Sequence, residues 1–96
     1  MEQIAVEAEY INFLPTVWMP DFKGTFFIDS NGNVSLNHEI LTLDSALISR
    51  WDHIEMNGKQ RINMWIAGES FIILDDDALS IATRFFEKHL KHLYRE

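Results

Sequence analysis

Two clusters of polar side chains near the C-terminus have residue types that bind metal ions. His89 and His92 are three residues apart, with Glu96 one helical turn beyond them. Imidazole and carboxylate groups are zinc ligands, but the familiar zinc-binding pair on a helix is spaced at four residues. Residues 75–77 are three consecutive aspartates, which suit a divalent cation but are equally favoured at the start of a helix. We therefore expect neither cluster to be a metal site.

A third polar segment, from Asp29 to Asn33, resembles the beginning of a calcium-binding loop. Such a loop requires glycine at its sixth position and glutamate at its twelfth. Counted from Asp29, these positions are Val34 and Ile40, so the pattern fails twice. The Asn31-Gly32 pair instead predicts a hairpin turn, in which both residues adopt positive φ angles.

Residues suited to catalysis are few. His38-Glu39 and Asp52-His53 each place an acid beside an imidazole, but neighbours in sequence point in different directions on a strand or a helix. The chain has no cysteine, which excludes disulfides, thiolate metal sites and thiol catalysis. It also has no glycine-rich phosphate loop and no nucleophile elbow. We expect a protein that is not an enzyme and needs no cofactor.

Charge supplies the strongest functional signal. The 96 residues include 15 acids and 8 bases, giving a net charge of −7. This balance argues against direct binding of nucleic acid or of anionic membranes. Residues 1–48 hold seven of the acids but only one base, Lys23, whereas residues 49–96 hold eight acids and seven bases. The first half is therefore expected to face a basic partner.

An apolar pair lies within this acidic half. Trp18 and Met19 fall between Pro15 and Pro20, which restrict the backbone on both sides. Tryptophan is enriched at the centres of protein interfaces, so the pair could anchor a partner. The alternative is that Trp18 folds back over one end of the sheet. We predict that the following residues bind the partner: Glu7, Glu9, Trp18, Met19, Asp21, Asp29 and Glu39.

These features favour a small acidic binding protein that inhibits or neutralises a basic protein partner. Immunity proteins, antitoxins and phage-type inhibitors of nucleic-acid-handling proteins work through such charge pairing. One alternative is a regulatory domain that binds a small molecule or peptide between the sheet and the last helix. Another is a homodimeric accessory subunit. The N-terminus lacks the features of a signal peptide and no apolar run has the length of a membrane helix, so a cytoplasmic location is expected.

Most elements can be assigned from the spacing of apolar residues. Length and the absence of a linker indicate a single domain over residues 1–96. Alternating apolar and polar residues and short apolar runs predict strands at residues 3–12, 23–29, 33–40, 60–66 and 71–74. A helix is expected over residues 76–94, with one face formed by Leu79, Ala82, Phe86, Leu90 and Leu93 and widened by Ile81 and Phe85.

Residues 43–56 decide between two folds. Leu43, Leu47, Ile48, Trp51 and Ile54 would form one apolar stripe on a helix. With this helix, the fold class is α+β, a two-layer sandwich of an antiparallel sheet of about five strands and two helices. The alternative makes the end of this segment a strand that enters an Asn57-Gly58 hairpin. The fold would then be a curved sheet or small barrel, capped by the C-terminal helix.

Overall fold

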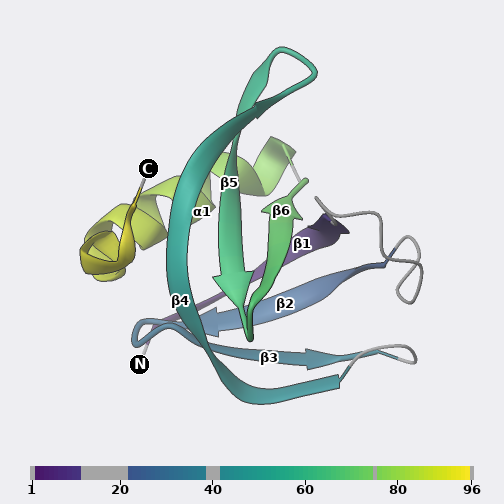
Figure 1. Ribbon diagram of the computed structural model, residues 1–96. Helices are drawn as coiled ribbons and strands as arrows, with labels where there is room; N and C mark the ends of the chain where they lie inside the picture. The colour runs from purple at the N-terminus through teal and green to yellow at the C-terminus, as the bar shows by residue number, and fades with distance from the viewer. Residues whose placement is uncertain (1, 12–21, 39–41, 75, 96) are drawn as a thin grey trace.

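The computed structural model describes residues 2–11, 22–38, 42–74 and 76–95. Within these residues the strands are β1 (Gln3–Ile11), β2 (Lys23–Asp29), β3 (Asn33–Asn37), β4 (Thr42–Met56), β5 (Lys59–Ile66) and β6 (Glu69–Ile73). Each strand pairs antiparallel with the next, and β1 also pairs with β6, so the sheet closes into a barrel (Figure 1). Helix α1 (Asp76–His89) and a short 3-10 helix, η1 (Lys91–Leu93), follow the last strand.

The α+β class with an antiparallel sheet and a C-terminal helix is confirmed, but the predicted second helix is wrong. Residues 42–56 form β4, so the described chain has six strands and one α-helix, arranged as the barrel alternative rather than the two-layer sandwich. The five predicted strands lie at or near their expected positions. Residue 38 lies beyond the end of β3, and residues 12, 39 and 40 fall outside the described residues.

Two extra residues in β4 explain why its sequence imitates a helix. Between the pairs Val34–Ala46 and Leu36–Leu43, β4 advances three residues while β3 advances two. A second bulge lies between the pairs Ile48–Ile66 and Arg50–Trp65, where β4 advances two residues while β5 advances one. Each bulge lengthens the two-residue period of a strand to three. The inward apolar side chains in the first part of β4 therefore recur at intervals of three, two and three residues, which approaches the spacing of a helical stripe: Leu43, Ala46, Ile48 and Trp51. Leu47, which the predicted stripe included, is instead exposed.

The hairpin turns follow the local chemistry of glycine. Asn57 and Gly58, with φ of 54° and 78°, form a two-residue turn between β4 and β5. This is the hairpin that the alternative to a helix over residues 43–56 predicted. At Asn31-Gly32 only Gly32 has positive φ, 85°, and its N–H donates to the Asp29 carbonyl at 3.0 Å. The predicted hairpin is confirmed there, but both residues were expected to have positive φ, and this detail is wrong.

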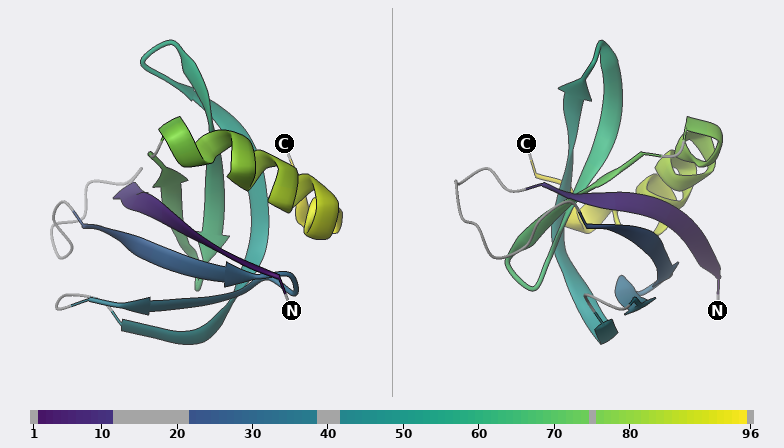
Figure 2. Two further views of the ribbon diagram at one scale, coloured as in Figure 1. Left: turned by 180° about the vertical axis from the view of Figure 1, so that it is seen from behind. Right: turned by 90° about the vertical axis from the view of Figure 1, so that its right-hand side faces the viewer.

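Helix α1 lies across the back of the barrel and contacts β1 and β5 (Figure 2). Its Ala82, Phe85 and Phe86 side chains join the buried residues of the barrel in one hydrophobic core. The helix ends at His89 instead of continuing to residue 94, because the chain turns after Leu90 into η1. No helix among the described residues is long and apolar enough to cross a membrane.

The end of the chain is fastened to β4. The indole N–H of the fully buried Trp51 donates to the Leu90 carbonyl at 2.7 Å. The Arg95 N–H donates to the Trp51 carbonyl at 3.0 Å, and Trp51 also forms a parallel bridge with Tyr94. Because one tryptophan makes all these contacts, the position of α1 depends on β4 as well as on its own apolar face.

Replacing Phe86 tests this shared core. The Phe86 ring is fully buried and packs against Trp51, with ring centroids 5.2 Å apart. Phe86→Ala should lower the free energy of unfolding by about 3–5 kcal/mol, because a large cavity forms between helix and barrel. Urea unfolding measures the loss. Ile81, which was expected to widen the apolar face, is instead 58 % exposed. Ile81→Ala is therefore the control and should change stability by no more than about 0.5 kcal/mol. Equal effects of the two substitutions would contradict the assigned helix face.

Candidate functional site

Aromatic side chains fill the inside of the barrel. Phe22, Phe26 and Phe71 are at most 2 % exposed, and their ring centroids lie 5.0 to 6.4 Å apart. Such edge-to-face and tilted contacts leave little room for a ligand among these rings.

One outward face carries an aromatic side chain that the core does not use. Phe27, in the middle of β2, points away from the buried Phe26 and Ile28 and remains 45 % exposed. Leu47 of β4 is also outward and 62 % exposed. Single exposed apolar side chains are common on protein surfaces, but an aromatic ring with polar neighbours is also the usual type of side chain at the centre of a protein interface.

Two shallow hollows lie beside Phe27. The first, of about 260 Å³, is lined by Gln3, Phe27, Asp29, Asn33, Ser35 and Ser45. The second, of about 310 Å³, is lined by residues that include Phe27, Ser35, Asn37, Thr42, Leu43 and Asp44. Phe27 and Ser35 belong to both hollows and stand between them. We call Phe27 and the two hollows the Phe27 face; no basic residue lines either hollow in the described part of the chain.

Asp29 gives the Phe27 face a fixed negative charge. Its Oδ1 accepts hydrogen bonds from the backbone N–H groups of Asn31 and Asn33, at 2.9 and 3.0 Å. Its Oδ2 accepts one from the Asn33 side-chain amide at 3.2 Å. Burial opposes ionisation of Asp29, but together these donors outweigh it and hold the pKa of the carboxyl below its usual value. Asp29 is thus one of the predicted binding residues and also the residue that shapes the β2–β3 turn.

The structure brings two other predicted residues together, at a distance from Asp29. Glu7 and Glu9 lie on the outer face of β1. The Glu7 carboxylate forms an ion pair with the Lys23 ammonium of β2, with Oε1 and Nζ 3.0 Å apart. The hydrogen bond to Glu7 raises the pKa of Lys23, and the charges of Glu7 and Glu9 add to this. Asp29 pairs with Gln3 of β1. Gln3 and Glu7 are four residues apart on this strand, so their Cα atoms are about 13 Å apart.

The remaining predicted residues lie outside the described residues. These are Trp18, Met19, Asp21 and Glu39. The proposal of an apolar anchor at Trp18 and Met19 therefore stays a prediction.

No family model, no curated protein and no solved structure matches this chain. Inferences about its function therefore come from its own residues.

Sequence reasoning missed Phe27, although the signal is present. The segment from Phe26 to Ile28 looks like a buried apolar run, which hides the alternation. Read with a period of two, Phe27 shares its face with Lys23, Thr25 and Asp29, all polar. An aromatic residue on a polar strand face would have marked this position as a candidate.

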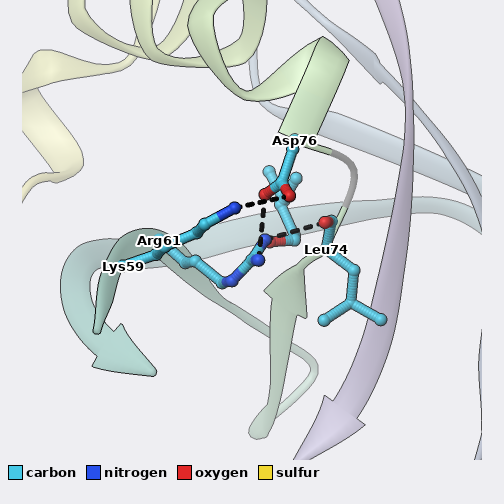
Figure 3. Close-up of polar contacts among 5 residues, drawn as sticks. Lys59, Arg61, Leu74 and Asp76 are labelled. Atoms are coloured by element: carbon cyan, nitrogen blue, oxygen red, sulfur yellow. Dashed lines mark hydrogen bonds and ion pairs between the residues drawn. The ribbon is translucent and has the colours of Figure 1, made fainter. Parts of the chain in front are cut away.

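Of the three aspartates at the start of α1, Asp76 is engaged by basic side chains, and Asp75 lies outside the described residues. Asp76 lies 3.0 Å from the Lys59 ammonium and 2.9 Å from the Arg61 guanidinium (Figure 3). Arg61 also donates to the Leu74 carbonyl at 2.7 Å. Two neighbouring cations disfavour a bound metal ion, so this cluster fastens the helix to β5 instead.

The histidine cluster is likewise divided. His89 lies 2.8 Å from the Glu2 carboxylate, to which Lys88 also donates at 3.2 Å. Hydrogen bonds from His89 and Lys88 and the charge of Lys88 lower the pKa of Glu2. The described residues contain no group of three or more acidic or histidine side chains that could hold a metal ion, and Glu96 is not among them.

The acid and the imidazole of the Asp52-His53 pair point apart. Asp52 forms an ion pair with Arg50 at 2.7 Å, whereas the His53 ring packs 5.6 Å from the ring of Tyr94. The His38 ring packs 4.8 Å from Phe22, and its neighbour Glu39 lies outside the described residues. In Asp52-His53 the two groups thus have separate partners.

A third hollow lies where β4 meets the end of α1. It has a volume of about 240 Å³ and is lined by Trp51, His53, Glu87, Lys91 and Tyr94. The Trp51 and Tyr94 rings pack against one another with their centroids 4.7 Å apart. The rim carries one acid, Glu87, and one base, Lys91. Opposite charges on one rim do not select a ligand of either sign.

Substitutions at Asp29 separate its structural role from its charge. Asp29→Ala removes both carboxylate oxygens, which accept three hydrogen bonds in the turn, and should lower the free energy of unfolding by about 1–3 kcal/mol. Asp29→Asn keeps a carbonyl oxygen for the two backbone donors and should lose much less. Chemical denaturation compares the two. If they lose the same free energy, the charge rather than the acceptor geometry supports the turn.

The ion pairs of Asp76 predict acid sensitivity. Hydrogen bonding from Lys59 and the charge of Arg61 hold the pKa of Asp76 below its usual value. A depressed folded-state pKa contributes stability above the unfolded value, and this is lost as the pH falls through the folded value. Between about pH 6 and pH 3, the Tm of wild type should therefore fall further than that of Asp76→Asn.

The control for this measurement is Glu55→Gln, at an exposed carboxylate in the β4–β5 hairpin with no ion pair among the described residues. It should keep the acid profile of wild type. Identical profiles for wild type and Asp76→Asn would remove Asp76 from the account of acid unfolding.

Proposed function

We propose that the protein is a small acidic binding protein, without catalytic activity, that inhibits or neutralises a basic protein partner through the Phe27 face. The observation that supports this most is the exposed Phe27 ring between two hollows that contain Asp29 and Asp44 but no basic residue. An apolar centre with a charged rim is the usual anatomy of a protein interface. A basic partner is the complement of this rim.

The charge of the surrounding surface supports the same partner. Described residues 2–11, 22–38 and 42–48 carry five acids and one base, Lys23, which is already paired with Glu7. Described residues 49–74 and 76–95 carry six acids and seven bases. Four of the five acids are on strands, namely Glu7 and Glu9 on β1, Asp29 on β2 and Asp44 on β4, and the fifth, Glu2, is paired with Lys88 and His89 of α1. Such a field would speed the encounter with a basic protein.

A nucleic-acid-handling protein is the partner class that fits best. Its working surface combines basic side chains that bind phosphates with groups that stack on bases. The Phe27 face presents carboxylates and an aromatic ring to such a surface. The proposal is thus an immunity protein, antitoxin or phage-type inhibitor that occupies the nucleic-acid site of its target, in the cytoplasm.

The first test is capture of the partner, followed by binding measurements on purified proteins. The immobilised chain is exposed to a lysate of its native cell, and bound proteins are identified by mass spectrometry. Each candidate is then purified and measured by surface plasmon resonance at two salt concentrations. We expect a basic, nucleic-acid-binding partner whose association slows as salt rises, because screening weakens steering.

Variants place the interface. Phe27→Ala should mainly speed dissociation and cost about 2 kcal/mol or more of binding free energy if the ring is central. Trp18→Ala is predicted to act in the same way. Charge reversal at Glu7 or Glu9 should slow association and reduce its salt dependence. Lys91→Glu, at an exposed base on η1, is the control and should change little. Loss of binding by Lys91→Glu with silent Phe27 and Glu7 variants would place the interface elsewhere.

A further inference from the structure

We propose that the first hollow of the Phe27 face receives an arginine side chain of the basic partner, whose guanidinium stacks on Phe27 and pairs with Asp29. This inference rests on the proposed function and names the chemical group that the site recognises. It commits to an arginine-bearing protein segment as the occupant of the hollow.

The spacing of the two side chains suits a guanidinium. Phe27 and Asp29 are two residues apart on the same outward face of β2, so their Cα atoms are about 7 Å apart. A guanidinium lying over the ring can be within the roughly 6 Å of a cation–π contact and still reach the carboxylate. One planar group would thus satisfy both the apolar and the charged wall of the hollow.

Asp29 retains capacity to accept this partner. Its Oδ1 already accepts two backbone hydrogen bonds, from Asn31 and Asn33, and the Gly32 N–H also acts on the carboxylate, whereas the bond to Oδ2, from the Asn33 side-chain amide, is the longest at 3.2 Å. A carboxylate oxygen offers two acceptor sites, so Oδ2 has room for another donor. The same contacts fix the carboxylate in place, which reduces the entropy lost on binding.

The rest of the lining favours arginine over lysine. The other residues of the first hollow are uncharged hydrogen-bonding residues: Gln3, Asn33, Ser35 and Ser45. A guanidinium has five N–H donors spread over a plane, whereas an ammonium has three on one atom. Several acceptors around an aromatic wall therefore match the fork of arginine better than the point charge of lysine. An anion is disfavoured by the ionised Asp29.

A second copy of this chain is the poorer occupant. If two Phe27 faces met, Asp29 and Asp44 of one copy would oppose the same carboxylates of the other. Like charges placed together across an interface cost binding energy, and no basic residue lines either hollow to offset them. The negative charge of the Phe27 face thus favours a basic partner over a second copy of this chain.

The experiment uses short peptides as probes of the isotopically labelled full chain. Capped five-residue peptides with a central arginine, lysine or citrulline between glycines are titrated to tens of millimolar and followed by NMR. The arginine peptide should give saturable shifts at the amides of residues 27, 29, 33, 35 and 45. The lysine peptide should bind about two- to fivefold more weakly, the size expected of the lost stacking at an exposed site. The uncharged citrulline peptide should bind more weakly still.

Two variants test the contributions of the Phe27 ring and of the Asp29 charge separately. Phe27→Leu keeps an apolar side chain but removes the ring, and should abolish the preference for arginine over lysine. Asp29→Asn keeps one oxygen for the two backbone donors of the turn but removes the charge, and should weaken the binding of both cationic peptides. Leu47→Ala is the matched control, since Leu47 is exposed on the same side of the barrel without lining the first hollow.

The outcomes also separate this inference from the proposed function. Equal arginine and lysine affinities, shifts spread over all surface acids, or no saturable shift would overturn the arginine site. A basic partner that binds through Phe27 would then still support the proposed function. Conversely, saturable arginine binding at the hollow together with only acidic captured partners would leave the site standing and overturn the proposed function. Concentration-dependent dimerisation through Phe27 in analytical ultracentrifugation would overturn both.

Discussion

The strong bend of β4 is the constraint on which the rest of this fold depends. The strand pairs with β3 through its first half and with β5 through its second half, and a bulge interrupts each pairing. Without the extra residues, a 15-residue strand would continue nearly straight and could not serve both sides of a small barrel. Because β4 bends, β6 comes back to β1 and the sheet closes (Figure 1). The same bend turns Trp51 toward the end of α1.

The bend also arranges the outer surface. Ser45 has a φ of 56° at the first bulge, and it lines the hollow beside Phe27. Its small side chain lets the β4 backbone follow the turn without covering the ring. The exposed aromatic and the irregular strand beside it are thus two parts of one feature. Positive φ at a residue other than glycine is uncommon and is often found where a surface has a function.

The sequence was sufficient for five of the six strands of the described residues and for the start of α1, because regular alternation and a regular apolar stripe report directly on local structure. It failed at β4 because two bulges imitate the spacing of a helix, and register shifts are set by pairing partners that are distant in sequence. For the site, the acidic half was apparent and Asp29 was among the predicted residues. Its neighbours in the hollow come from β1, β3 and β4, and only the closed sheet brings them together. Phe27 was missed because it sits between two residues that are buried.

The joining of the first and last elements has a consequence for biosynthesis. Strand β1 needs β6 as a neighbour, and Glu2 is fastened to Lys88 and His89 of α1. During translation the inward side chains of β1 therefore remain partly uncovered until residue 90 has left the ribosome. Contacts between such distant positions slow folding and prolong the exposure of apolar surface. Newly made chains should thus depend on chaperones more than their small size suggests, and expression at lower temperature should raise the soluble yield.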